Sequence, residues 1–176
     1  IGLGLLIVLG FDQGETKSFE GTKDSFSFVA HLELFKSKKF WGYTMTLAFS
    51  SGCFFSFLGG ASYVASEDHA LSSIVAGLFI GFPAIGYFIG NYISGKYSKH
   101  KGTTFMIRLG CLNIISAMLL SFILSLVFYP NPYIFFGLCI FVGSGCGLII
   151  PNASAGILSI NVRLSGTAGG VGNAIM

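Results

Sequence analysis

The 176-residue chain is 53% hydrophobic and only 10% charged, with a formal net charge of +3 and a mean hydropathy of +0.78. A soluble domain carries about 25% charged residues, so this chain lacks the charge to cover a water-facing surface. Its basic residues form no stripe interleaved with aromatic side chains, which excludes a nucleic-acid-binding footprint.

The basic residues alternate along the chain. All ten lysines and arginines lie in three polar segments, at residues 17–39, 96–108 and 163. The two segments between them, 66–71 and 129–133, contain none. The positive-inside rule predicts this alternation for successive loops of a polytopic protein. We therefore expect a multi-pass protein of the inner or plasma membrane, in contact with the lipid bilayer, whose cytoplasmic loops are 12–39, 95–102 and 159–165.

The first part of the chain contains no complete span. Residues 1–11 form an apolar run that is too short to cross alone, because spanning takes about 20 residues, so we expect it to be the end of one transmembrane helix. In the polar segment 12–39, apolar residues from Phe26 to Phe35 recur at near-helical spacing, which predicts a short amphipathic helix at the membrane surface. Because the chain starts and stops inside apolar runs, we expect a fragment of a longer membrane protein.

Residues 40–176 are expected to form a transmembrane bundle. Four apolar runs are long enough to cross a bilayer and a fifth is partial: 40–65, 72–94, 103–128, 133–158 and 166–176. The runs are continuous rather than alternating, which indicates helices and not barrel strands. The predicted fold class is therefore an all-α integral membrane protein with four complete and two partial transmembrane helices.

Motifs for enzyme or metal chemistry are incomplete. The glycine-rich segment 143–147 has no preceding strand and no acidic partner, which indicates close helix packing rather than a dinucleotide loop. In segment 90–97, Tyr97 replaces the Ser or Thr that a phosphate-binding loop places on Mg²⁺. The spans contain no His, Asp or Glu, and the chain contains no C-x-x-C. We expect no enzyme activity, no metal site and no bound cofactor.

The informative polar residues of the spans are neutral. Pro83 interrupts the second span, and Pro151 and Asn152 lie in the inner half of the fourth. Proline frees a backbone carbonyl and permits helix bending, a recurring device of transporters. Asn152 is equally typical of plain interhelical hydrogen bonding, and both interpretations stay open. A carboxylate that couples transport to protons is expected in the missing part of the protein.

Two segments near the end of the chain are informative together: the run GSGCGLIIPNASAGILS at 143–159 and the run GTAGG at 166–170. They resemble the tenth and eleventh helices of the Bcr/CflA-type drug:proton antiporters of the major facilitator superfamily. FWGY at 40–43 and GASYV at 60–64 resemble the two ends of helix seven, and residues 15–16 match the centre of a P-E-T-L sequence after helix six. The resemblance implies a stretch of a twelve-helix transporter, from the end of helix six to the start of helix eleven.

The loop after helix eight departs from the superfamily pattern. The acidic position of a G-x-x-x-D-x-x-G-R-type sequence falls at Ser94, so a charge relay in this loop is not expected. A basic loop remains, able to meet helix ends or anionic lipid through Lys96, Lys99 and Lys101.

The resemblance also implies a substrate cavity. Two six-helix halves would rock about a midplane site, so the N-terminal half is an expected partner and the proton gradient the energy source. Helices seven and ten would line the cavity for a small-molecule substrate, with Ser50, Phe54, Phe57 and Asn152 as candidate lining residues. The first three share one helix face, and their aromatic surface suits lipophilic compounds.

Proton-coupled efflux of small amphipathic compounds by alternating access, as in multidrug resistance, is the function that the resemblance implies. The alternatives are uptake of a metabolite by another branch of the superfamily, a membrane-embedded enzyme, and a non-transport membrane subunit. An enzyme needs acid, base or metal ligands at one depth, which the spans lack. The embedded Pro and Asn residues weigh against a purely structural subunit.

Overall fold

The computed structural model describes residues 34–63, 72–127, 132–161 and 164–176. Within these ranges five long helices follow one another and no strand occurs: α3 (Lys38–Tyr63), α4 (Ser73–Lys101), α5 (Thr103–Val127), α6 (Pro132–Ile160) and α7 (Ser165–Ile175). The predicted helix end at 1–11, most of the amphipathic segment and Arg163 lie outside the described residues.

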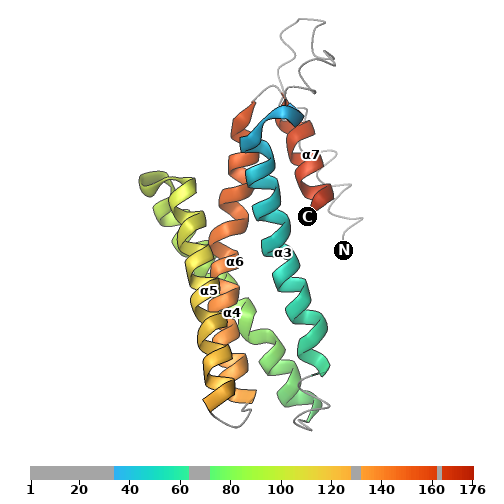
Figure 1. Cartoon of the computed structure of the whole chain (residues 1–176), viewed down its shortest axis with the longest axis vertical. Helices are drawn as coiled ribbons and strands as arrows, with labels where there is room; N and C mark the ends of the chain where they lie inside the picture. Colours follow the sequence, from blue (N-terminus) through green and yellow to red (C-terminus); the bar gives the residue numbers. More distant parts are fainter. Residues whose placement is uncertain (1–33, 64–71, 128–131, 162–163) are drawn as a thin grey trace, which may run out of the picture.

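Four of these helices, α3 to α6, are long and apolar enough to cross a membrane. They run alternately up and down, so that successive helices begin at opposite ends of the bundle (Figure 1). The predicted all-α membrane fold is confirmed. The helix ends differ from the predicted spans by a few residues, except at the end of α4.

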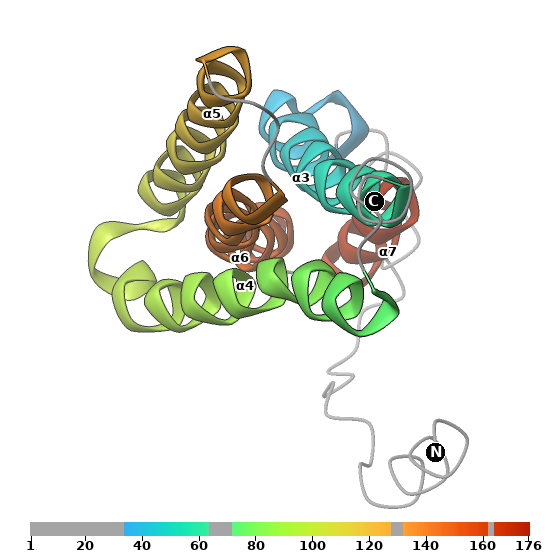
Figure 2. The same cartoon turned by 90° about the horizontal axis from the view of Figure 1, so that it is seen from below.

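Helix α6 lies at the centre of the bundle and contacts α3, α4, α5 and α7 (Figure 2). Half of its most apolar stretch is buried inside the protein, against 11% for the equally apolar stretch of α5. Helix α5 therefore exposes a long apolar face, of the kind that soluble proteins avoid and that lipid covers.

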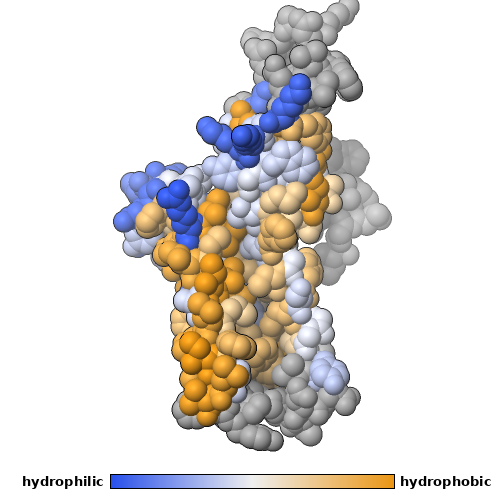
Figure 3. Space-filling view, in the orientation of Figure 1, coloured by the Kyte–Doolittle hydropathy of each residue, from blue (hydrophilic) through white to orange (hydrophobic). Residues whose placement is uncertain are grey.

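Charged side chains gather at one end of the bundle, above a predominantly apolar body (Figure 3). The start of α3, the end of α4 and the start of α5 lie at this end (Figure 1). We call it the basic end, after its six described lysines: Lys36, Lys38, Lys39, Lys96, Lys99 and Lys101. Two basic segments that are far apart in the sequence thus meet on one side, as the alternation of charge predicts.

Helix α4 continues past the predicted span 72–94 through most of the predicted loop 95–102. Lys96, Lys99 and Lys101 therefore lie on its last turns and not in a loop. Lysines near a helix C-terminus interact favourably with the helix dipole, which favours this extension into water. Gly102, with φ of 83°, donates its N–H to the Ser98 carbonyl and ends the helix, and α5 begins at the next residue.

The α4–α6 crossing depends on glycine. Gly86 and Gly90 on α4 face Gly143 and Gly147 on α6, each pair in GxxxG spacing. A Cβ atom at Gly86 would overlap the carbonyl oxygen of Ile140, so the two backbones are in direct contact. Close approach through small residues is a main source of helix association in membranes. The packing role predicted for segment 143–147 is therefore confirmed.

The two helix-interior prolines lie within continuous helices, Pro83 in α4 and Pro151 in α6. Pro83 belongs to the crossing itself, because its carbonyl group lies against Gly143.

Candidate substrate-binding region

Asn152 lies inside the α4–α6 interface, only 2% exposed. Its Oδ1 accepts a hydrogen bond from the Ser98 hydroxyl at 2.6 Å, and its Nδ2 donates to Ser94 Oγ at 2.6 Å and to the Leu148 carbonyl at 2.7 Å. Both amide hydrogens and the amide oxygen are thus engaged within the protein. Of the two roles considered for Asn152, this geometry provides interhelical hydrogen bonding.

This network also gives Ser94 a role. Ser94 occupies the position where the superfamily pattern has an acidic residue, and its side chain is 4% exposed against Asn152. A neutral hydroxyl–amide network therefore joins α4 to α6 near the basic end. A similar one joins α5 to α6, where Asn113 Nδ2 donates to Ser144 Oγ at 2.6 Å and to the Phe141 carbonyl at 3.1 Å.

The predicted cavity face of α3 lies against α4 and α6. Ser50 is buried, and its backbone carbonyl accepts a contact from the Cys146 thiol at 3.5 Å. The half-buried ring of Phe54 lies 6.4 Å from Tyr87 of α4, between ring centroids, and that of Phe57 lies 6.3 Å from Phe136 of α6. The three residues share a face, as their spacing predicts, but that face packs within this bundle.

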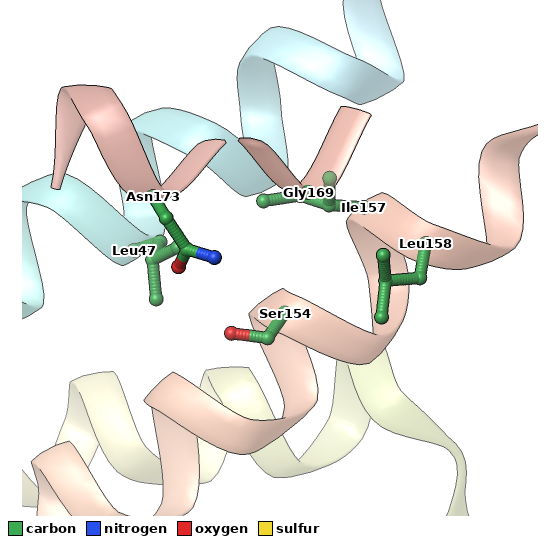
Figure 4. Close-up of a pocket in the computed structure, with 6 residues that line it drawn as sticks. All are labelled: Leu47, Ser154, Ile157, Leu158, Gly169 and Asn173. Carbon is green, nitrogen blue, oxygen red and sulfur yellow. The ribbon is translucent and has the colours of Figure 1, made fainter. Parts of the chain in front are cut away.

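A small, partly open pocket of about 40 Å³ lies where α3, α6 and α7 meet (Figure 4). Leu47 of α3 forms one wall, and α6 and α7 form the others. The polar groups of the wall are the hydroxyl of Ser154 on α6 and the amide of Asn173 on α7, which point into the same space (Figure 4). The remaining wall is apolar or glycine: Ile157, Leu158 and Gly169.

The pocket is small and uncharged. Sites that enclose a drug-sized ligand typically measure about 300–1,000 Å³. This cavity measures about 40 Å³, so it holds no more than one small group of such a ligand. Apolar walls with a few convergent neutral polar groups match the lining of small-molecule sites. No residue of the wall is ionisable. The pocket can therefore receive one small neutral group.

None of the four predicted cavity residues lines this pocket. The two polar residues of the pocket could have been picked out from the sequence. Ser154 follows Asn152 by two residues in the same predicted span, and Asn173 is an amide inside an apolar, glycine-rich run. The helix period alone does not show which face of α6 meets α3 and α7 and which meets α4.

A central apolar helix, packed among helices long and apolar enough to cross a membrane, defines a polytopic α-helical membrane protein. The family model for the Major Facilitator Superfamily matches residues 1–176, and the chain belongs to this family. Members of the family are transporters and not enzymes, so the chain is part of a multi-pass membrane transporter. Comparison with curated proteins and with solved structures found no match.

Proposed function

We propose that this protein exports small amphipathic compounds across the inner or plasma membrane by alternating access, in exchange for protons. The observation that carries the proposal is the pocket between α3, α6 and α7, which combines apolar walls with the neutral polar groups of Ser154 and Asn173. An amphipathic compound presents this combination of surfaces.

The depth of the pocket supports a transport role. Leu47 lies nine residues after Lys38, where α3 begins at the basic end, and Asn173 lies eight residues after the start of α7. At 1.5 Å per residue these positions are about 12–14 Å along their helices. On α6 and α7 the pocket also reaches toward the basic end, because Leu158 lies two residues before the end of α6 and Gly169 four residues after the start of α7. The hydrocarbon core is about 30 Å thick, so in this proposal the pocket lies in the half of that core nearest the basic end. Polar groups at such depth mark substrate pathways in many transporters.

The small size of the pocket fits a site that two halves share. We propose that this chain acts as the C-terminal half of a twelve-helix transporter and that the N-terminal half completes the site. The predicted spans contain no Asp or Glu, so the proton-coupling carboxylate belongs to the other half. The basic end faces the cytoplasm in this proposal.

The uncharged wall that this chain contributes suits the apolar part of a lipophilic compound better than the charged group of an anionic metabolite. A carboxylate or phosphate inside the membrane requires a cationic partner, and no lysine, arginine or histidine lines the pocket.

The proposal is tested in cells that lack their own efflux pumps and express the complete gene product containing this chain. We expect low retention of a fluorescent lipophilic dye, rising when the proton gradient is collapsed, only in expressing cells. Ser154→Phe should fill the pocket and raise retention. Ser116→Phe makes the same change on the exposed face of α5 and should leave export intact. Equal retention in expressing and empty cells would contradict dye export.

A further inference from the structure

Helix α3 carries three buried hydroxyl groups without a hydrogen-bond partner. These are the Oγ atoms of Thr44, Ser50 and Ser51, whose side chains are 0%, 5% and 2% exposed. A hydroxyl group that is removed from water and left unpaired is unfavourable, and in a membrane protein no bulk solvent can relieve it.

Other hydroxyls of this chain avoid that situation by bonding to their own helix. Thr46, two residues after Thr44 on the same helix, donates its hydroxyl hydrogen to the Gly42 carbonyl at 2.7 Å. Ser116, Ser125 and Ser159 likewise donate to the carbonyl three residues earlier. Such bonds are the usual solution for Ser and Thr inside a helix. The unpaired hydroxyls of α3 therefore need another explanation.

Two of them flank the pocket. Thr44, Leu47 and Ser51 are three and four residues apart, so they lie on one face of α3, one turn from each other. Leu47 forms the α3 wall of the pocket. The hydroxyls of Thr44 and Ser51 thus lie one turn on either side of that wall, on the face that packs toward α6.

The packing of α3 on α6 at this level is mainly apolar. Phe40 and Leu47 belong to one apolar cluster with Ile149, Ala153 and Ile157 of α6. Amide–hydroxyl hydrogen bonds, by contrast, hold α4 and α5 to α6. Apolar contacts are not directional, so a small group can enter between α3 and α6 without breaking a hydrogen bond.

We propose that Thr44 and Ser51 each bind one small neutral hydrogen-bonding group, which reaches them from the pocket on either side of Leu47. A hydroxyl group both donates and accepts, so it takes water or the hydroxyl or amide of a substrate equally well. An ion is excluded, because the pocket wall offers no opposite charge. The substrate part of this inference rests on the proposed export function, whereas the water part does not.

Thiol labelling tests the inference on the complete protein in membrane vesicles, after replacement of its native cysteines. Only a thiolate reacts, and apolar burial suppresses its formation, so reaction with a small water-soluble maleimide reports that the site is hydrated and wide enough to admit the reagent. We expect Thr44→Cys and Ser51→Cys to react about tenfold or more faster than Ala117→Cys, which is equally buried on α5. A transported dye should then slow both reactions.

The outcomes separate the sources of the ligand. Labelling that the dye slows supports binding of a substrate group, and labelling that the dye leaves unchanged supports water and overturns the substrate part. Labelling no faster than that of Ala117→Cys shows that no group larger than water enters and overturns the substrate part, and the melting temperature of Thr44→Val then decides the water part. If the dye is not transported at all, the export function fails, while labelling without dye still tests the site.

A second measurement keeps the native cysteines. Thr44→Val replaces the hydroxyl by a methyl group of similar size. If the site is dry, removal of an unpaired hydroxyl raises the melting temperature of the detergent-solubilised protein; if water occupies it, the temperature falls. We expect a fall, and a rise would overturn the inference even if the cysteine variants fail to fold.

Discussion

Loss of the Asn152 amide should loosen α4 from α6 by a predictable amount. Asn152→Ala removes two interhelical hydrogen bonds of 2.6 Å each, from Ser98 and to Ser94. Interhelical hydrogen bonds in membrane proteins contribute about 0.6 kcal/mol on average and up to about 1.7 kcal/mol. The two bonds together therefore predict a loss of about 1–3 kcal/mol in the free energy of unfolding.

A double-mutant cycle isolates the hydrogen-bond contribution from the space that the smaller side chain leaves. Unfolding of the complete protein by SDS in mixed micelles would be measured for Asn152→Ala, Ser98→Ala and the double variant. We expect the two losses to be non-additive by about 0.6–1.7 kcal/mol. Ser159→Ala is the control, because its hydroxyl bonds only within α6, to the Gly156 carbonyl. Additive losses for Asn152 and Ser98 would refute the network.

Three further predictions concern packing and the pocket. Gly86→Ala places a Cβ against the Ile140 carbonyl and should lower the free energy of unfolding by about 1–3 kcal/mol. Gly81→Ala on the same helix is the control, because no atom lies within 4 Å of its Cβ position. Equal thermal stability of the two variants would contradict the crossing. Phe136→Ala removes a fully buried ring stacked 5.3 Å from Phe79 and should destabilise by about 3–5 kcal/mol in thermal unfolding; a loss below about 1 kcal/mol would contradict the packing. Ser154→Phe should abolish dye export at unchanged membrane abundance, and undiminished export would exclude the pocket as part of the substrate route.

The membrane helices could be predicted from the sequence because hydropathy and charge act locally. In a long apolar run the backbone N–H and C=O groups must hydrogen-bond within a helix, so the sequence alone predicts four spans. Lysines in the loops indicate which helix ends face the cytoplasm, so it also predicts the alternating direction of the spans. The end of α4 was predicted too early because apolar content marks the membrane boundary, and a helix can continue into water. Helix α4 ends at Gly102, whose positive φ departs from the helical conformation.

The site could not be predicted to the same extent because it depends on which helices meet. The helix period groups Ser50, Phe54 and Phe57 on one face, but it does not show whether that face meets a cavity or α4 and α6. Asn152 forms hydrogen bonds with Ser98 and Ser94, which precede it in the sequence by 54 and 58 positions. The glycine-lined crossing of α4 and α6 allows these residues to meet. The pocket combines three helices, and no local pattern relates Leu47 to Asn173.

The most direct test of the account is transport by the purified complete protein in proteoliposomes. A pH gradient would be imposed across the vesicle membrane, and the movement of a lipophilic dye followed by fluorescence. We predict gradient-dependent flux that Ser154→Phe abolishes and Ser116→Phe preserves. No gradient-dependent flux from protein that is folded and inserted would contradict proton-coupled export, and equal flux from both variants would contradict the pocket as its substrate site.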